Sequence, residues 1–148
     1  MTSWHLLVTA DDSPESLTAA TSAARLAREL HAQVRILVVV EDDHAGPHPA
    51  DDAALARESR RREAANLLAY LHRRICDLGV PEDQVDVAQA TGEPFREILD
   101  HARTWPADVI VMATSDQRGV RSNYIGSVTQ QVIEFAQCPV LVVPGGSS

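Results

Sequence analysis

Five short apolar runs alternate along the chain with segments of helical periodicity, and this alternation restricts the fold more than any other feature of the sequence. The runs are rich in Val, Ile and Leu, as strands buried on both faces of a sheet are. They cover His5–Ala10, Val34–Val40, Gln84–Ala90, Asp108–Ala113 and Pro139–Pro144. The alternation predicts an α/β fold: a doubly wound, parallel, five-stranded sheet with helices on both faces. Because the chain has 148 residues and no evident linker, we expect a single domain spanning residues 1–148.

Four helical patterns separate these runs, and each carries an apolar stripe that can pack on the sheet. They cover Pro14–Leu30, Asp52–Leu78, Pro94–Arg103 and Ile125–Phe135. We expect Asp12 or Ser13 to cap the first helix, with Pro14 in the first turn, where its missing N–H costs nothing. The third apolar run alternates, with Val85 and Val87 on one face, which is typical of a strand at the edge of a sheet.

Composition excludes several classes of protein. The net charge is −8 and the 13 basic residues are scattered, so we expect no nucleic-acid partner and no binding to an anionic membrane. Every basic residue is an arginine, and without a lysine neither a Walker-type phosphate loop nor a Schiff-base enzyme can be built. No apolar stretch approaches the ~20 residues of a membrane span, and no signal peptide is evident, so we expect a cytoplasmic location.

Ligands of doubly wound sheets bind beyond the carboxyl ends of the strands, so the loops that follow strands are the candidate functional segments. Asp11 and Asp12 follow the first run and allow three interpretations. They could bind magnesium in a phosphoryl-receiving domain, but such a domain also requires a lysine, which the chain lacks. Asp11 could accept hydrogen bonds from a ribose or a base edge. Both aspartates could instead only cap the helix.

The longest candidate segment runs from Ala113 to Thr129. Gly126 and Ser127 stand at the start of the last helix, where free backbone N–H groups and the helix dipole favour an anion. The hydroxyls of Ser127 and Thr129 add hydrogen-bond donors. The alternative is ordinary capping of the helix by Ser127, and the spacing alone does not separate the two.

No metal site and no catalytic residue is predicted. The segment Glu41–Asp52 combines carboxylates with two histidines, but its glycine and two prolines indicate a solvated acidic loop without the fixed geometry that a metal requires. No Ser-His-Asp arrangement and no Cys-His pair stands out, so catalysis has no evident general base.

Three segments are similar to the universal stress protein family and together cover nearly the whole chain. The first strand and helix, LLVTADDSPESLTAATSAARLA, resemble the opening of the family, where an aspartate follows the first strand. GEPFREILDHARTWPADVIVMATS resembles the segment before the family's glycine loop, and IGSVTQQVIEFAQCPVLVVP resembles the family's ending. The resemblance implies a Rossmann-like sheet in the order 3-2-1-4-5. It also implies a homodimer through the last strand, which would cover an apolar edge formed by Val140, Leu141, Val142 and Val143.

The resemblance further implies an adenine-nucleotide pocket, because ATP-binding members of the family carry the motif G-x-x-G-x(9)-G-[ST] after the fourth strand. Here Ala113 and Asp116 stand at the first two glycine positions, and Gly126-Ser127 completes the motif. Asp11 matches the aspartate that contacts the nucleoside, and Val40 matches the residue whose backbone contacts adenine. The other matching residues are Met112, Val128 and Thr129, near the ribose and phosphates, and Thr9, beside the base.

Asp116 is the departure from the motif with the larger consequence. Aspartate is among the better substitutes for a glycine in the left-handed conformation, so the shape of the loop can persist. A carboxylate about 4 Å from a phosphate charge costs about 1 kcal/mol at a water-like dielectric and about 4 kcal/mol at an effective value near 20. This corresponds to roughly one to three decades of affinity. Arg118 or Arg121 could offset the charge, as could a Mg²⁺ ion between Asp116 and ATP.

The sequence therefore predicts a dimeric regulatory module of the stress response, with an adenine-nucleotide-type pocket that binds ATP weakly or not at all. Mg²⁺ is expected only if ATP binds. The alternative is an enzyme on the same fold, either a slow ATP hydrolase or an adenylylating enzyme. A third possibility is an interaction protein without a ligand, in which Asp116 blocks the pocket.

Overall fold

A computed structural model describes residues 3–41, 50–114 and 125–144 of the chain. Its strands are β1 (His5–Ala10), β2 (Gln33–Val40), β3 (Val85–Thr91), β4 (Val109–Ala113) and β5 (Val140–Val143). Its helices are α1 (Glu15–Leu30), α2 (Ala50–Asp77), α3 (Pro94–Thr104) and α4 (Ser127–Phe135), and a short 3₁₀ helix, η1 (Glu82–Gln84), precedes β3. The strands and helices predicted from the sequence are all present, and their ends differ from the prediction by at most a few residues.

The five strands form one parallel sheet in the order β3-β2-β1-β4-β5. This confirms the doubly wound, Rossmann-like architecture, and it confirms that the alternating third strand lies at an edge. The central strand β1 pairs with β2 on one side and with β4 on the other. The chain therefore changes direction across the sheet beside β1, which is where doubly wound sheets leave room for a ligand.

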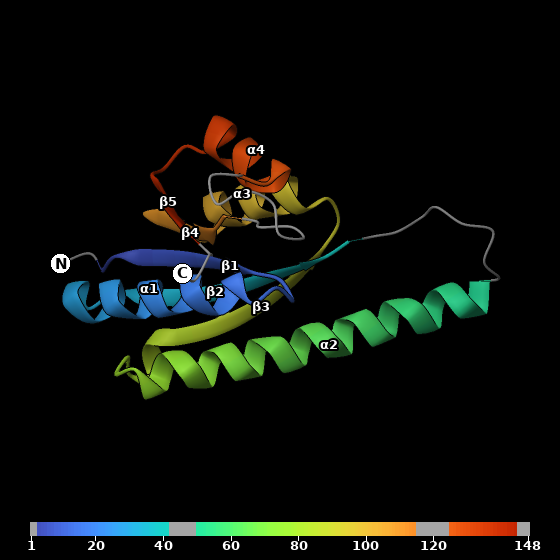
Figure 1. Cartoon of the computed structure of the whole chain (residues 1–148), viewed down its shortest axis with the longest axis horizontal. Coiled ribbons are helices and arrows are strands. Elements are labelled where there is room, and N and C mark those ends of the chain that lie inside the picture. Colours follow the sequence, from blue (N-terminus) through green and yellow to red (C-terminus); the bar gives the residue numbers. More distant parts are fainter. Residues whose placement is uncertain (1–2, 42–49, 115–124, 145–148) are drawn as a thin grey trace.

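Helices α1 and α2 cover one face of the sheet, below it in Figure 1. The face of α1 that meets the sheet consists mainly of alanines, which let the helix backbone come close to the strands. Ala19, Ala20, Ala23, Ala24 and Ala27 are almost completely buried there. The larger side chains of α2 complete this core, with Ala64, Leu68, Leu71 and Ile75 buried at helical spacing.

Helices α3 and α4 cover the opposite face, above the sheet in Figure 1. Because side chains alternate along a strand, Leu6 and Val8 of β1 enter the α1/α2 core, whereas Leu7 enters the α3/α4 core. The buried members of this second core are Leu7, Leu37, Ile98, Ile110, Met112 and Val132.

The expected capping of α1 by Asp12 or Ser13 is wrong. Pro14 occupies the N-cap position, and no side chain makes a capping hydrogen bond to the helix. The N–H groups of Ser16 and Leu17 are instead accepted by the backbone carbonyls of Ser13 and Pro14, both at 3.2 Å. The hydroxyl of Ser13 donates to Oδ1 of Asp11. Likewise, Gly126 is the N-cap of α4 without a side-chain capping bond, so Ser127 does not cap that helix.

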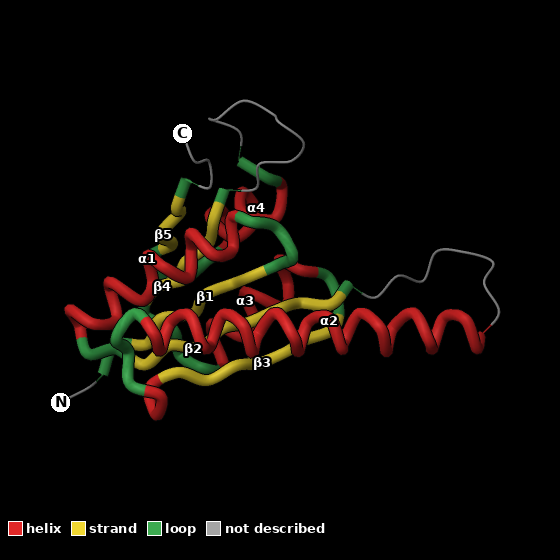
Figure 2. Tube along the Cα trace, turned by 60° about the horizontal axis from the view of Figure 1, so that its bottom comes forward, coloured by secondary structure: helices red, strands yellow, loops and turns green. Residues whose placement is uncertain are grey.

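Helix α2 is 28 residues long, and its amino-terminal turns extend past the end of the sheet (Figure 2). Leu55 in this part is 67% exposed, and Ala64 is the first buried side chain described along the helix. Within residues 3–41, 50–114 and 125–144, none of the helices combines the length and the apolar character that crossing a membrane requires.

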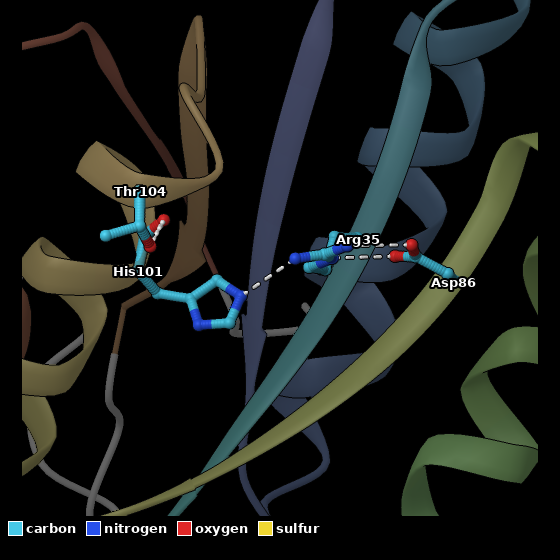
Figure 3. A network of polar contacts seen from close by, with 4 residues as sticks. All are labelled: Arg35, Asp86, His101 and Thr104. Atoms are coloured by element: carbon cyan, nitrogen blue, oxygen red, sulfur yellow. Dashed lines mark hydrogen bonds and ion pairs between the residues drawn. The ribbon is translucent and has the colours of Figure 1, made fainter.

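A polar network near the amino ends of the strands fastens α3 to the sheet (Figure 3). Arg35 Nε and Nη2 donate to the two carboxylate oxygens of Asp86 at 2.9 and 3.0 Å. Arg35 Nη1 lies 3.3 Å from His101 Nε2, and the guanidinium lies over the Trp105 ring, 4.9 Å from its centroid. Burial, and then the charge of Arg35, lower the pKa of His101. The neutral imidazole is the form that can accept the Arg35 hydrogen bond.

Candidate functional site

A cavity of about 630 Å³ opens at the carboxyl ends of β1, β2 and β4. Its volume lies within the range of roughly 300–1,000 Å³ that is common for small-molecule sites. The start of α1, the amino-terminal half of α3 and the first turn of α4 complete its walls. The cavity therefore occupies the position beside β1 at which the topology predicts a ligand.

Eight of the ten residues predicted for the site line this cavity, although they come from three separate segments of the chain. They are Thr9, Asp11, Met112, Ala113, Gly126, Ser127, Val128 and Thr129. The tenth residue, Asp116, lies outside the described residues, as do Arg118 and Arg121 and most of the acidic segment that follows β2.

Val40 does not line the cavity. Its side chain points into the core beneath α1 and α2, and its backbone carbonyl accepts the N–H of Gly92 at 3.0 Å. The neighbouring residues Val39 and Glu41 line the cavity instead. The alternation of side chains along β2 explains this, because Val39 shares its face with Leu37, which also lines the cavity.

The turn after β1 holds Asp11 in a defined position. Asp11 Oδ1 accepts the backbone N–H of Ser13 at 2.9 Å and is also bonded by the Ser13 hydroxyl. The hydroxyl of Ser16 lies 3.0 Å from the same oxygen, and it accepts the backbone N–H of Asp11 at 2.7 Å. Across the part of the chain that the structure covers, Oδ2 of Asp11 has no hydrogen-bond partner. One carboxylate oxygen is thus left available on a residue that lines the cavity.

The first turn of α4 presents hydrogen-bond donors to the same cavity. The first N–H groups of a helix have no intrahelical acceptor, and the helix dipole adds partial positive charge there. Gly126 is buried, whereas Ser127 is exposed, and among the described residues its hydroxyl has no partner. The buried hydroxyl of Thr129 donates to the carbonyl of Ala113 at 3.4 Å, which ties α4 to the end of β4. Of the two predicted hydroxyl donors, Ser127 is therefore the free one.

An apolar wall formed by β2, β4 and α3 completes the site. It includes Leu37, Val39, Pro94, Ile98 and Met112, which together provide surface suited to a planar ring. Met112 is the one residue of this wall that was predicted from the sequence to belong to the site. The period of two in β2 could have indicated Leu37 and Val39, since both lie on the face opposite to Val40.

The charges of the site are few among the described residues. Asp11 and Glu41 are the ionisable side chains among those lining residues. No group of three or more His, Cys, Asp or Glu in the described segments is arranged to hold a metal ion. The arrangement can accept hydrogen bonds from hydroxyl or amino groups at Asp11 and donate to an anion at α4, beside an apolar wall.

Comparison with known proteins gives a consistent picture. Residues 4–144 match the model of the universal stress protein family. A universal stress protein of Methanocaldococcus jannaschii is 32% identical over 139 residues, which cover 93% of this chain and 80% of that protein.

Solved structures share the fold. A universal stress protein of Lactobacillus plantarum superimposes with a TM-score of 0.83 at 25% identity, over 97% of this chain and 99% of the other. A universal stress protein of Archaeoglobus fulgidus in complex with dAMP superimposes with a TM-score of 0.69 at 23% identity, over 96% of this chain and 98% of the other.

Proposed function

The chain belongs to the universal stress protein family, and on that premise we propose that it is a dimeric regulatory module of the stress response that holds an adenine nucleotide in the cavity beside β1. The observation that carries the proposal is the convergence of three kinds of group on one cavity. These are Oδ2 of Asp11, which has no partner in the described part of the chain, the amino terminus of α4 and the apolar wall of β2, β4 and α3. A nucleotide has a matching part for each: ribose hydroxyls, a phosphate and a planar base.

A relative whose structure contains a ligand supports an adenine nucleotide as the class of molecule that binds here. The structure from Archaeoglobus fulgidus contains dAMP, which is an adenine nucleotide with a single phosphate. A monophosphate needs only the donors of the first turn of α4, where the Ser127 hydroxyl has no partner among the described residues. We therefore expect AMP to bind in this cavity through Asp11 and the start of α4.

We further propose that ATP binds weakly because of Asp116. This residue stands where ATP-binding members have the second glycine of the motif, and its carboxylate would repel a chain of phosphates. At about 4 Å the repulsion costs about 1 to 4 kcal/mol, depending on the effective dielectric. Asp116→Gly should accordingly tighten ATP binding by roughly one to three decades.

Calorimetric titration of the purified protein with AMP, and with ATP in the presence of Mg²⁺, tests the proposal. We expect measurable binding of AMP and an ATP dissociation constant above the micromolar range. Asp11→Ala should abolish binding. Asp12→Ala is the matched control, because it removes the same charge from the adjacent residue, which does not line the cavity. Sub-micromolar ATP binding by the wild-type protein would contradict the role given to Asp116, and phosphate release during the titration would favour the enzymatic alternative.

The dimer is proposed to form through β5. In the sheet β5 pairs with β4 on one side only, and Leu141 at this edge is 40% exposed. An apolar edge strand is a surface that a second copy of the chain can cover by continuing the sheet. The predicted contact therefore consists of Val140, Leu141, Val142 and Val143.

A further inference from the structure

The two oxygens of the Asp11 carboxylate have different surroundings. Oδ1 is contacted by three donors: the backbone N–H of Ser13, the hydroxyl of Ser13 and the hydroxyl of Ser16. Oδ2 has no partner within the described segments. Because an ionised carboxylate oxygen offers about two acceptor sites, Oδ1 has no capacity left for a ligand. An incoming hydroxyl group can bond only to Oδ2.

Ser16 is the residue that joins this carboxylate to the body of the protein. It lies in the first turn of α1 and is only 4% exposed, which is unusual for a serine. Its hydroxyl accepts the Asp11 N–H at 2.7 Å and lies 2.9 Å from the Asp11 carbonyl oxygen and 3.0 Å from Oδ1. A buried hydroxyl must be satisfied in this way, so Ser16 fixes both the backbone and the side chain of Asp11.

We propose that Ser16 is a positioning residue that sets the sugar selectivity of the cavity. With Asp11 held in this orientation, Oδ2 can accept one hydrogen bond from each of the two vicinal hydroxyls of a ribose. A 2′-deoxyribose offers only one of them. A hydrogen bond to a charged group is worth enough that its loss should weaken binding by at least roughly tenfold. The wild-type protein should therefore prefer AMP to dAMP by about this factor. This inference rests on the proposed binding of an adenine nucleotide.

The test compares AMP with dAMP by calorimetric titration of the wild-type protein and Ser16→Ala. Removing the hydroxyl takes away one of the three donors to Oδ1 and the acceptor of the Asp11 N–H. The carboxylate is then held less firmly, so we expect AMP binding to weaken about tenfold and the ratio of AMP to dAMP affinity to fall towards one. Ser22→Ala is the matched control. It deletes the same group from the same helix, at a site remote from the cavity lining, and should leave the ratio unchanged.

The comparison of the two nucleotides separates positioning from a general structural effect. If Ser16 acts through the Asp11 carboxylate, Ser16→Ala should weaken AMP binding more than dAMP binding, because only AMP uses both hydrogen bonds to Oδ2. A merely structural role would instead weaken both nucleotides by the same factor. An unchanged AMP-to-dAMP ratio in Ser16→Ala overturns the proposal.

A measurement without ligand distinguishes failure of this inference from failure of the proposed function. Amide hydrogen exchange of Asp11 should accelerate in Ser16→Ala, since its N–H loses its acceptor. If the wild-type protein binds neither nucleotide, the proposed function and the sugar selectivity are both refuted, and the exchange rate still decides whether Ser16 fixes Asp11. If Asp11 exchanges at the same rate in both proteins, the positioning role is refuted even where nucleotides bind.

Discussion

Replacing Arg35 by methionine should destabilise the protein by about 1.5 to 2 kcal/mol. The value follows from the contacts of its guanidinium. The bidentate pair with Asp86, at 2.9 and 3.0 Å, joins side chains that are 25% and 55% exposed. Solvent screens such a half-exposed pair, so it contributes about 1 kcal/mol. The contact with Trp105 at 4.9 Å adds about 0.5 to 1 kcal/mol. Methionine retains most of the apolar stem, so little packing is lost.

Urea unfolding followed by far-UV circular dichroism, at one fixed protein concentration, measures this loss. A decrease of this size lowers the melting temperature by roughly 3 to 8 °C in a domain of this length. Asp86→Asn keeps the contact with Trp105 and should lose only about half as much. Arg62→Met is the control, because its pair with Glu58 is long, at 3.8 Å, and exposed on both sides. The reasoning is refuted if Arg35→Met costs no more than Arg62→Met.

Three further predictions follow from single features. The pKa of His101 is lowered in the folded protein, so the unfolded chain binds more protons below about pH 6.5. The free energy of unfolding of the wild-type protein should therefore decrease more than that of His101→Gln as the pH drops from about 7.5 to 5. Equal slopes of stability against pH in the two proteins would contradict this. Gly92 has a φ of +148°, a backbone conformation that strains any residue with a side chain. Gly92→Ala should therefore lower the free energy of unfolding in urea by about 1 to 3 kcal/mol. An unchanged free energy of unfolding would contradict this backbone conformation. The proposed dimer should become a monomer in Leu141→Arg, as measured by analytical ultracentrifugation, whereas Val87→Arg, at the opposite edge and 44% exposed, should leave it intact. Dimers that persist in Leu141→Arg would refute the β5 interface.

The strands and helices could be predicted from the sequence because the residue pattern that indicates each of them lies within one continuous segment of the chain. The continuous apolar run of β1 and the helical spacing in α1 each depend on neighbouring residues. The order of the strands does not follow from periodicity, and it was inferred from the resemblance to a family. The contacts of Arg35 with Asp86 and His101 join residues 51 and 66 positions apart, and nothing local in the sequence indicates them.

Part of the candidate site could also be predicted, because some of its residues stand next to predicted strands and helices. Asp11 follows the end of a strand and Gly126-Ser127 begin a helix, so both could be identified from their place in the chain. The expectation that Asp12 or Ser13 caps α1 failed because the backbone carbonyls of Ser13 and Pro14 accept the N–H groups of Ser16 and Leu17, and this arrangement depends on the shape of the turn. Ser16 was overlooked because a serine in a first helical turn is common, and only its burial distinguishes it.

The central claim is that an adenine nucleotide occupies the cavity beside β1. Titration of ¹⁵N-labelled protein with AMP, followed by backbone amide chemical shifts, tests it most directly. We predict that the largest changes fall on Asp11, Gly126, Ser127 and Val128, and that they vanish in Asp11→Ala and persist in Asp12→Ala. Shifts confined to other surfaces, such as the exposed turns of α2, or no shifts at millimolar AMP, would contradict the account.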